Sequence, residues 1–529
     1  MKRTIFLLAA IALICSCSKS RLSADKVPEP TPEEEFPAGG EMVLGHKLDN
    51  PFSVLNMANA LHSYLTGTKS ALAGTVTVHT TDYYVRFLPA SKEDIETLEN
   101  LGLELLDHPL DAEIVQDGDW YHDPSLPEDQ ITWQYTVVGR NFKFPEGIRY
   151  EILEDCFLPE NDDLGTRSAL IDWSAVENEA YKQTGNSGML DKGALTKGGG
   201  DKPSGRIMIM DDGLGQAVPV PGVRVTCNTF MRIGKAYTNE QGYYSISKSF
   251  SSKPRYRIVF KNKKGFGIGL NTILFPASYS GLGRHSASGV SRTVSSKSNR
   301  NLYCRCVVNN AVYDYFNSCK EDGQSMAQPP ANLRLWIFQT LAESSTLMIQ
   351  QGVFVDNTFI GDFLGEYTGL FKKFMPDITI GVRNKTDYAS IYDTVIHECA
   401  HASHFKKVGK AWWEKLIAYM VNSWIDSGEL YGLGTEKNSG YCDVAESWAY
   451  YVETKLHGNR YPDDRQIFGT SWWFSPQIFY YLDERGLTRF KICEALTKDV
   501  TDRAGLEEEL IKRYPDFGTT IQVAFNRYN

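Results

Sequence analysis

The sequence lacks the basic character that marks proteins that bind nucleic acids. Its 529 residues contain no dense run of lysine and arginine, and the formal net charge is -10 with a pI near 5.6. Because a nucleic-acid surface needs a positive patch to meet the phosphates, we set this class of protein aside. Histidine is also scarce, with 10 residues in the whole chain. A group of histidines within a short segment is therefore informative.

Long apolar runs are missing except at the very start, MKRTIFLLAAIALICSCSKS. Its apolar stretch of roughly a dozen residues is too short for a stable membrane span and predicts an exported protein. The segment ICSC resembles the signal box of bacterial lipoproteins, with Cys17 as the lipidated residue. The resemblance implies a signal peptide at residues 1–17 and a lipid anchor in the bacterial cell envelope, in the outer membrane, on its periplasmic face or on the cell surface. An ordinary cleaved signal with an unmodified thiol is the alternative.

Residues 18–45 are rich in proline and glutamate and contain little that could be buried, so they are predicted to form a flexible tether. Apart from Cys15 and Cys17, eight cysteines are scattered along the chain. An exported protein can form disulfides, but the sequence cannot assign partners to these residues.

Residues 46–165 mix alternating strand patterns with one helical segment, in which Ser91 and Asp94 form a capping box. We expect a small N-terminal α+β module there, followed by a linker at residues 166–204 that ends in the glycine-rich segment TKGGGDKPSG. A module placed before an enzyme domain could act as a propeptide or an inhibitory lid.

Short apolar strands separated by proline and glycine turns occupy residues 205–262. The segments PGVRV at 221–225 and TNEQGYY at 238–244 resemble the carboxypeptidase regulatory-like domain, a transthyretin-like β-sandwich, and the second segment also predicts a hairpin. The resemblance implies an accessory domain without catalytic residues. Residues 263–325 are predicted to be a connecting region of loops, with a short strand at NLYCRCVVN, residues 301–309.

The segment YDTVIHECAHASHF, residues 392–405, contains the pattern HExxH. Ser390 is a predicted helix cap and Gly409 a predicted stop, so a helix is expected over residues 391–408. On that helix His397 and His401 lie about 40° apart and can converge on one metal ion. Glu398 lies beside them, where it can accept a proton from water and pass it to a leaving amine.

One helix cannot supply all the ligands of such an ion, because His404 lies about 4.5 Å beyond His401 along the helix axis. His404 is therefore expected to be a packing residue or to support the ligands. A later segment, YCDVAESWAYYVETKLH at 441–457, is predicted to be a helix. Its polar stripe contains the following candidates for an outside ligand or supporting role: Asp443, Glu446, Tyr450, Glu453 and His457.

At this point the sequence resembles the gluzincin metallopeptidases, which combine HExxH on one helix with a glutamate on a later one. The resemblance implies Zn²⁺ held by His397, His401 and Glu446, with Glu398 as the general base; Glu453 and Asp443 remain alternatives to Glu446. In the thermolysin branch of this family, an aspartate four residues after the ligand glutamate orients the first histidine, whereas this chain has Tyr450 at that position. The residue that orients His397 therefore stays open between Asp443 and Asp393. The residue that stabilises the oxyanion stays open between Tyr450, Tyr441 and His457.

The sequence thus predicts a multidomain α+β protein in which a mostly helical zincin-like domain occupies residues 326–529. Its segment MPDITIGVR, 375–383, is predicted to be a strand, either the edge strand along which a peptide substrate binds or an ordinary strand of the sheet. The expected function is zinc-dependent hydrolysis of peptides or proteins by a lipid-anchored enzyme. The alternative is a surface binding or adhesion lipoprotein whose zincin domain is inactive or structural.

Overall fold

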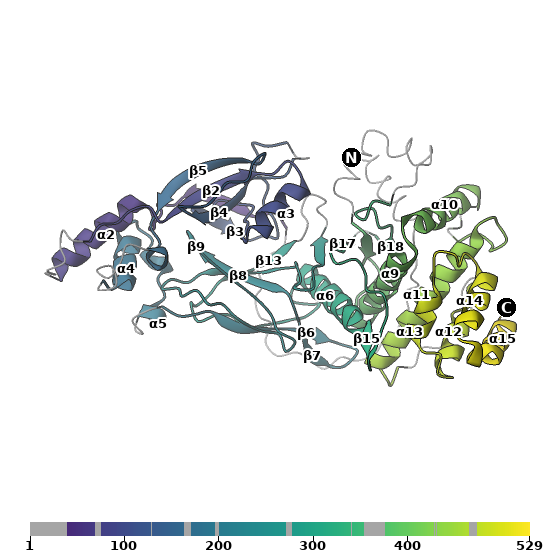
Figure 1. Cartoon of the computed structure of the whole chain (residues 1–529). Coiled ribbons are helices and arrows are strands. Elements are labelled where there is room, and N and C mark those ends of the chain that lie inside the picture. The colour runs from purple at the N-terminus through teal and green to yellow at the C-terminus, as the bar shows by residue number, and fades with distance from the viewer. Residues whose placement is uncertain are drawn as a thin grey trace.

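The computed structural model describes residues 40–68, 76–127, 130–162, 171–195, 200–270, 278–339, 341–353, 376–427, 429, 431–464 and 473–528. These residues form a mixed α+β structure, as expected. Figure 1 shows an elongated arrangement, with a strand-rich part at one end and a group of helices at the other. None of the described helices is long and apolar enough to cross a membrane.

The first part of the described chain is a small α+β unit. Its strands lie in an antiparallel sheet of order β4-β2-β5 and in the pair β1-β3. The predicted capping box of Ser91 and Asp94 is present at the start of its second helix. The element bounds are β1 Val43–Lys47, α2 Val54–Gly67, β2 Asp82–Leu88, α3 Lys92–Asn100, β3 Ala112–Gln116, β4 Gln134–Gly139 and β5 Arg149–Cys156. After this unit comes α4, Trp173–Gln183, which packs against α2.

Two four-stranded sheets follow, one containing β10-β6-β14 with β7 beside β6, the other of order β13-β11-β8-β9. The hairpin prediction is wrong: the turn after β9 carries the chain to the other sheet, where β10 pairs with β6. The strands also continue past residue 262, because pairing with β11 and β6 orders segments too rich in glycine, serine and arginine to be predicted as strands. The bounds are β6 Ser204–Asp211, β7 Gln216–Pro219, β8 Arg224–Thr229, β9 Arg232–Tyr237, β10 Tyr243–Ser245, β11 Arg255–Val259, β13 Tyr279–Arg284 and β14 Arg292–Val294.

The segment NLYCRCVVN, residues 301–309, is a helix and not the predicted short strand. It belongs to α6, Arg300–Ser318, whose first turn is capped by the side chain of Asn299 accepting from the backbone N–H of Leu302. The helix is buried on nearly all sides. Because buried residues surround its axis, with the polar Arg305, Asn309 and Asn310 among them, the sequence shows no apolar helical face that could distinguish it from a buried strand.

A third four-stranded sheet, of order β12-β17-β19-β18, lies next to the helices. Its strand β19 falls within the predicted segment 375–383, but β17 and β18 flank it on both sides, so it is an inner strand and not an edge strand. The antiparallel β18 is at the edge. The bounds are β12 Gly267–Leu270, β17 Arg334–Phe338, β18 Ser345–Thr346 and β19 Ile378–Gly381.

The C-terminal part of the described chain is helical. A single hydrophobic core runs from Ile207 on β6, through α6, to Phe525 near the C-terminus. Packing is therefore continuous across the domain boundaries predicted at residues 262 and 326. Cys156 and the other seven cysteines of the described chain are buried, and none of them forms a disulfide with another described residue. The helices are α9 Tyr388–Val408, α10 Lys410–Ser427, α11 Ser439–Arg460, α12 Pro476–Asp483, α13 Arg489–Ala495, α14 Arg503–Arg513 and α15 Gly518–Arg527.

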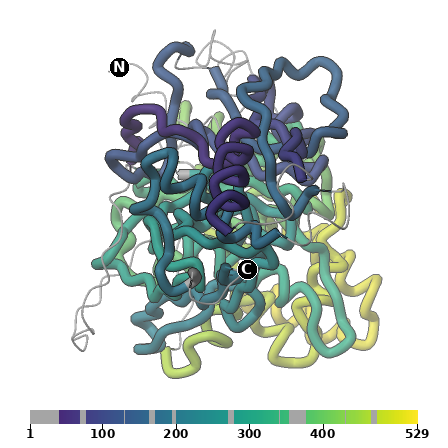
Figure 2. Tube along the Cα trace, turned by 90° about the vertical axis from the view of Figure 1, so that its left-hand side faces the viewer, coloured from purple at the N-terminus to yellow at the C-terminus, as the bar shows by residue number. Residues whose placement is uncertain are grey.

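Buried ion pairs join the N-terminal unit and the helix α4 that follows it to the rest. Arg232 on β9 binds Glu177 on α4 at 2.6 Å, and Arg305 on α6 binds Asp119, which lies between β3 and β4, at 2.7 Å. In Figure 2 this unit, coloured purple to blue, lies above the teal strands of the two four-stranded sheets. Breaking one partner of a buried pair is costly, so these contacts hold the unit in place.

Candidate metal centre

Helix α9 carries the HExxH pattern. It begins three residues earlier than predicted, because Asp387 is the cap and accepts a hydrogen bond from the backbone N–H of Ser390 at 2.8 Å. It ends at Gly409, as predicted, with a φ of 82° that suits glycine. His397, Glu398 and His401 are all fully or almost fully buried. The helix therefore presents the motif to the protein interior, which a solvated helix would not do.

Helix α11 packs directly against α9. It spans the predicted segment 441–457 and extends it by two residues at the N-terminus and three at the C-terminus. Glu446, Glu453 and His457 of its polar stripe contact α9, and Glu446 is 1% exposed. A charged residue is rarely buried so completely unless it has partners. The partners of Glu446 are the two motif histidines.

Three ligand groups converge where the two helices meet. The Nε2 atoms of His397 and His401 lie 3.1 Å apart, and Glu446 places Oε2 at 3.4 Å from the first and Oε1 at 3.3 Å from the second. All the potential ligand atoms lie within 4.8 Å of one another, so the group could hold a metal ion. Two imidazoles and one carboxylate form a donor set found in catalytic metal sites that leave one coordination position open.

Glu398 lies next to this group but is held by a different element. Thr346 on the edge strand β18 donates its hydroxyl to Glu398 Oε2 at 2.7 Å, while Oε1 has no hydrogen-bond partner in the described part of the chain. The backbone carbonyl of Thr346 is itself fixed by Trp413 Nε1 at 3.1 Å. One carboxylate oxygen is thus anchored, and the other is available to a water molecule.

Glu453, one of the alternatives to Glu446 as a ligand, contacts the opposite side of the first histidine. Its Oε2 lies 2.9 Å from His397 Nδ1, which leaves Nε2 directed at His401 and Glu446. A carboxylate on the second nitrogen of a ligating imidazole fixes its orientation and tautomer. The ring of Tyr450 packs edge-on against His397, with 4.6 Å between the ring centroids.

The electrostatics of the group follow from its burial. Burial raises the pKa of Glu398 to about 8. Burial also opposes the charged form of Glu446, but the two histidines outweigh this effect and lower the pKa of Glu446 to about 2. Burial opposes the charged form of His397 as well, but its partners Glu446 and Glu453 outweigh this effect and raise the pKa of His397. Burial lowers the pKa of Lys385, which interacts electrostatically with both Glu398 and Glu453. Carboxylates gathered in a buried site favour a bound cation.

His404 does not join the ligand group. It is 1% exposed, and its ring packs against Trp412 and Trp413 with centroids 4.7 and 5.9 Å away. Neither ring nitrogen has a hydrogen-bond partner among the described residues, and burial lowers its pKa to about 3. His404 is therefore a neutral packing residue, one of the two roles expected for it.

The other candidates have partners away from the two histidines. Asp443 forms a bidentate pair with Arg503 at 2.8 and 2.9 Å. His457 Nδ1 contacts Asp393 at 2.8 Å, one helical turn from the motif. The hydroxyl of Tyr441 accepts a hydrogen bond from Lys415 Nζ at 3.2 Å. These contacts join helices and do not orient His397 or His401.

Two residues beside Glu398 carried no signal in the sequence. Thr346 belongs to a two-residue strand, and Lys385 lies in the loop after β19, where its ammonium donates to the backbone carbonyls of Ala342 and Gly381 at 3.0 and 3.1 Å. Neither forms part of a motif, and only tertiary packing brings them to α9. Cys17, the predicted lipidation site, lies outside the described residues.

Comparison of the sequence with protein-family models gave no match, and no curated protein matches it either. The arrangement of side chains therefore carries the functional argument. It can hold a cation on three buried ligands, and it can present one free carboxylate oxygen beside that cation.

Proposed function

We propose that this chain is a zinc-dependent peptidase of the gluzincin type, exported and attached to the bacterial cell envelope by a lipid on Cys17. The observation that carries the proposal is the convergence of His397, His401 and Glu446 beside a separately anchored Glu398. A purely structural metal site has no use for an adjacent carboxylate with a free oxygen. The signal-like start of the sequence supports export and attachment to the outer membrane. The predicted order of the domains is part of the same proposal.

His397, His401 and Glu446 would hold the zinc ion. When bound, zinc supplies Lewis acidity that lowers the pKa of a water molecule toward about 7 and polarises a carbonyl group. Glu398 accepts the proton of the attacking water on Oε1 and gives it to the leaving amine as the peptide bond breaks. Thr346 keeps the other oxygen in place during both transfers, because its hydrogen bond to Oε2 needs no rearrangement.

The test of the proposal is elemental analysis combined with digestion of casein, on soluble protein that begins at residue 18. We expect about one zinc ion per chain, since the described cluster offers one ligand set. Removing the metal with a chelator should abolish digestion, and adding zinc should restore it. Folded protein without zinc would contradict the metal site. Bound zinc without digestion of casein or of a peptide library would favour the alternative, a binding lipoprotein with a structural zincin domain.

A separate prediction concerns Glu453. The substitution Glu453→Gln is expected to weaken zinc binding by about 10- to 100-fold, because the amide holds His397 Nδ1 less firmly than the carboxylate does. Competition with a chromophoric chelator measures this affinity. Glu414→Gln on α10 is the matched control and should bind zinc as the wild type does.

The outcome also decides between two roles of Glu453. If it orients His397, zinc at saturating concentration still binds in a one-to-one ratio in Glu453→Gln. Complete loss of binding at saturation would instead make Glu453 a direct ligand, which was the alternative drawn from the sequence.

A further inference from the structure

A second candidate site lies away from the HExxH motif, between the N-terminal unit and the two four-stranded sheets that follow it in the chain. It is a cleft of about 540 Å³. One wall comes from β2, β4 and the segment after α3, and the other from β9 and the segment after β10. A volume of this size is in the range of clefts that bind small organic ligands, which run from about 300 to 1,000 Å³.

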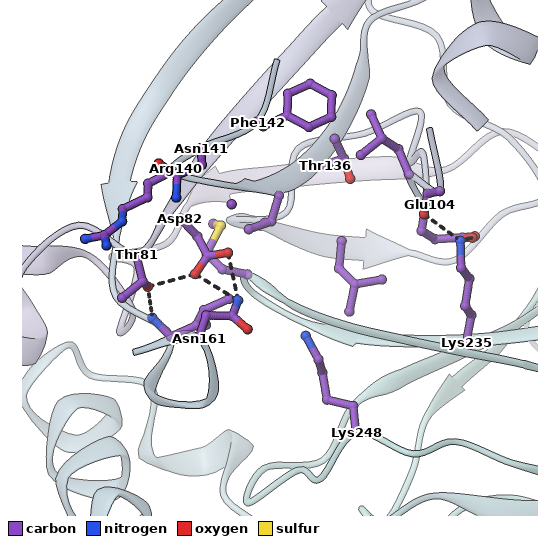
Figure 3. A pocket seen from close by; sticks show the side chains of 17 residues that line it. Thr81, Asp82, Glu104, Thr136, Arg140, Asn141, Phe142, Asn161, Lys235 and Lys248 are labelled. Atoms are coloured by element: carbon purple, nitrogen blue, oxygen red, sulfur yellow. Dashed lines mark hydrogen bonds and ion pairs between the residues drawn. The ribbon is translucent and has the colours of Figure 1, made fainter. Parts of the chain in front are cut away.

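One side of the cleft carries a lysine with unused donors. Lys248 has no hydrogen bond in the described part of the chain, and its only ion pair is with Glu160 at 3.5 Å. That carboxylate is already held more closely by Arg232, at 2.8 Å. Figure 3 shows Lys248 extending from the sheet side into the space between the Asp82–Asn161 pair and the Glu104–Lys235 pair. Its ammonium can therefore receive an anionic group.

The other side carries a buried carboxylate with unused acceptors. Glu104 is 6% exposed, and neither of its oxygens has a hydrogen-bond partner among the residues that the structure describes. Its ion pairs with Arg224 and Lys235 are at 3.4 and 3.6 Å, longer than hydrogen bonds. A buried polar group without hydrogen bonds is costly, so a ligand that donates to Glu104 would recover that free energy.

A third polar group borders the space between them. Asp82 is buried and accepts from Thr81 at 2.7 Å and from Asn161 at 2.8 and 3.0 Å. These bonds fix its orientation and leave further lone pairs on its oxygens. The cleft thus combines a lysine whose donors make no hydrogen bond in the described part of the chain with two buried carboxylates, and its lining also contains apolar side chains such as Met231 and Ile233.

We propose that this cleft binds a small zwitterion, a free amino acid or a short peptide, with its carboxylate on Lys248 and its ammonium on Glu104 or Asp82. The ion-pairing chemistry stands on the cleft alone, whereas the choice of a peptide rests on the proposed function. Such a site would hold a hydrolysis product or a chain end of the substrate on the N-terminal unit, away from the metal centre.

The test is calorimetry with trialanine as the probe, on the chain that begins at residue 18 and carries Glu398→Gln to prevent cleavage. Each titration is repeated after treatment with a chelator, since binding in the cleft does not depend on the metal. Trialanine amide and N-acetyl-trialanine remove one ligand charge each, and free alanine distinguishes an amino acid from a peptide. The variants are Lys248→Met and, as the matched control on an exposed lysine, Lys202→Met.

We expect Lys248→Met to weaken trialanine binding by at least about tenfold and to leave the binding of trialanine amide unchanged, because the amide has no carboxylate for Lys248. Lys202→Met should bind both as the parent does. The proposal is overturned if trialanine does not bind, or if Lys248→Met weakens the two peptides equally. A protein without zinc or hydrolysis that still shows this charge dependence would refute the proposed function and retain the cleft.

Discussion

Replacing Glu398 with glutamine is expected to lower the rate of peptide hydrolysis by at least about 10²- to 10⁴-fold while one zinc ion stays bound. Glutamine has the shape of glutamate, and its side-chain carbonyl can still accept the hydrogen bond that the Thr346 hydroxyl donates to Glu398 Oε2 at 2.7 Å. What it lacks is a site that can take a proton. The loss should therefore appear in kcat and not in metal content.

Three measurements on the same preparation check this result: zinc content, kcat with a fluorogenic peptide, and the melting temperature. Glu414→Gln, the same change on the neighbouring helix α10, should retain wild-type kcat. Because burial of Glu398 favours its neutral form, Glu398→Gln is not expected to destabilise the fold. A kcat within tenfold of the wild-type value would remove Glu398 from the mechanism.

The central part of the candidate site could be predicted from the sequence because it follows from helix geometry. Histidines four residues apart share a helix face, and the glycine at 409 marks where that helix ends. Glu446 could be proposed because its helix lacks breakers and has a polar stripe. The structure brings Glu446 within 3.4 Å of both histidines, but the sequence alone could not separate it from Glu453. That choice depends on how α11 is rotated against α9.

The errors arose where long-range packing overrides local pattern. The segment at 301–309 has the composition of a buried strand, yet it lies in a helix that is covered on nearly all sides. The turn at 238–242 has a hairpin sequence, yet it passes the chain to the opposite sheet. Thr346 has no motif at all, because its role comes from the pairing of β18 with β19, which places its hydroxyl against α9.

The second large effect is expected for Glu446→Ala. If Glu446 is a direct ligand, as we propose, this change should weaken zinc binding by more than about 100-fold, which is beyond what the loss of a supporting residue costs. Glu446 is the one described carboxylate that contacts the Nε2 atoms of both motif histidines, at 3.4 and 3.3 Å. Hydrolysis should fall to the level of chelator-treated wild type. Zinc titration by calorimetry and peptide hydrolysis measure the two losses.

Alanine at this buried position also leaves a cavity, so the integrity of the fold needs its own measurement by circular dichroism. The helix pair has a further link, where His457, about three turns beyond Glu446 on α11, contacts Asp393 on α9 at 2.8 Å, and we therefore expect α9 and α11 to remain packed. Asp443→Asn is the matched control: it changes a carboxylate on the same helix that pairs with Arg503 instead of a histidine, and it should retain zinc. If Glu446→Ala kept its zinc and Asp443→Asn lost it, the third ligand would be Asp443, and the helices would have to rotate to bring it there.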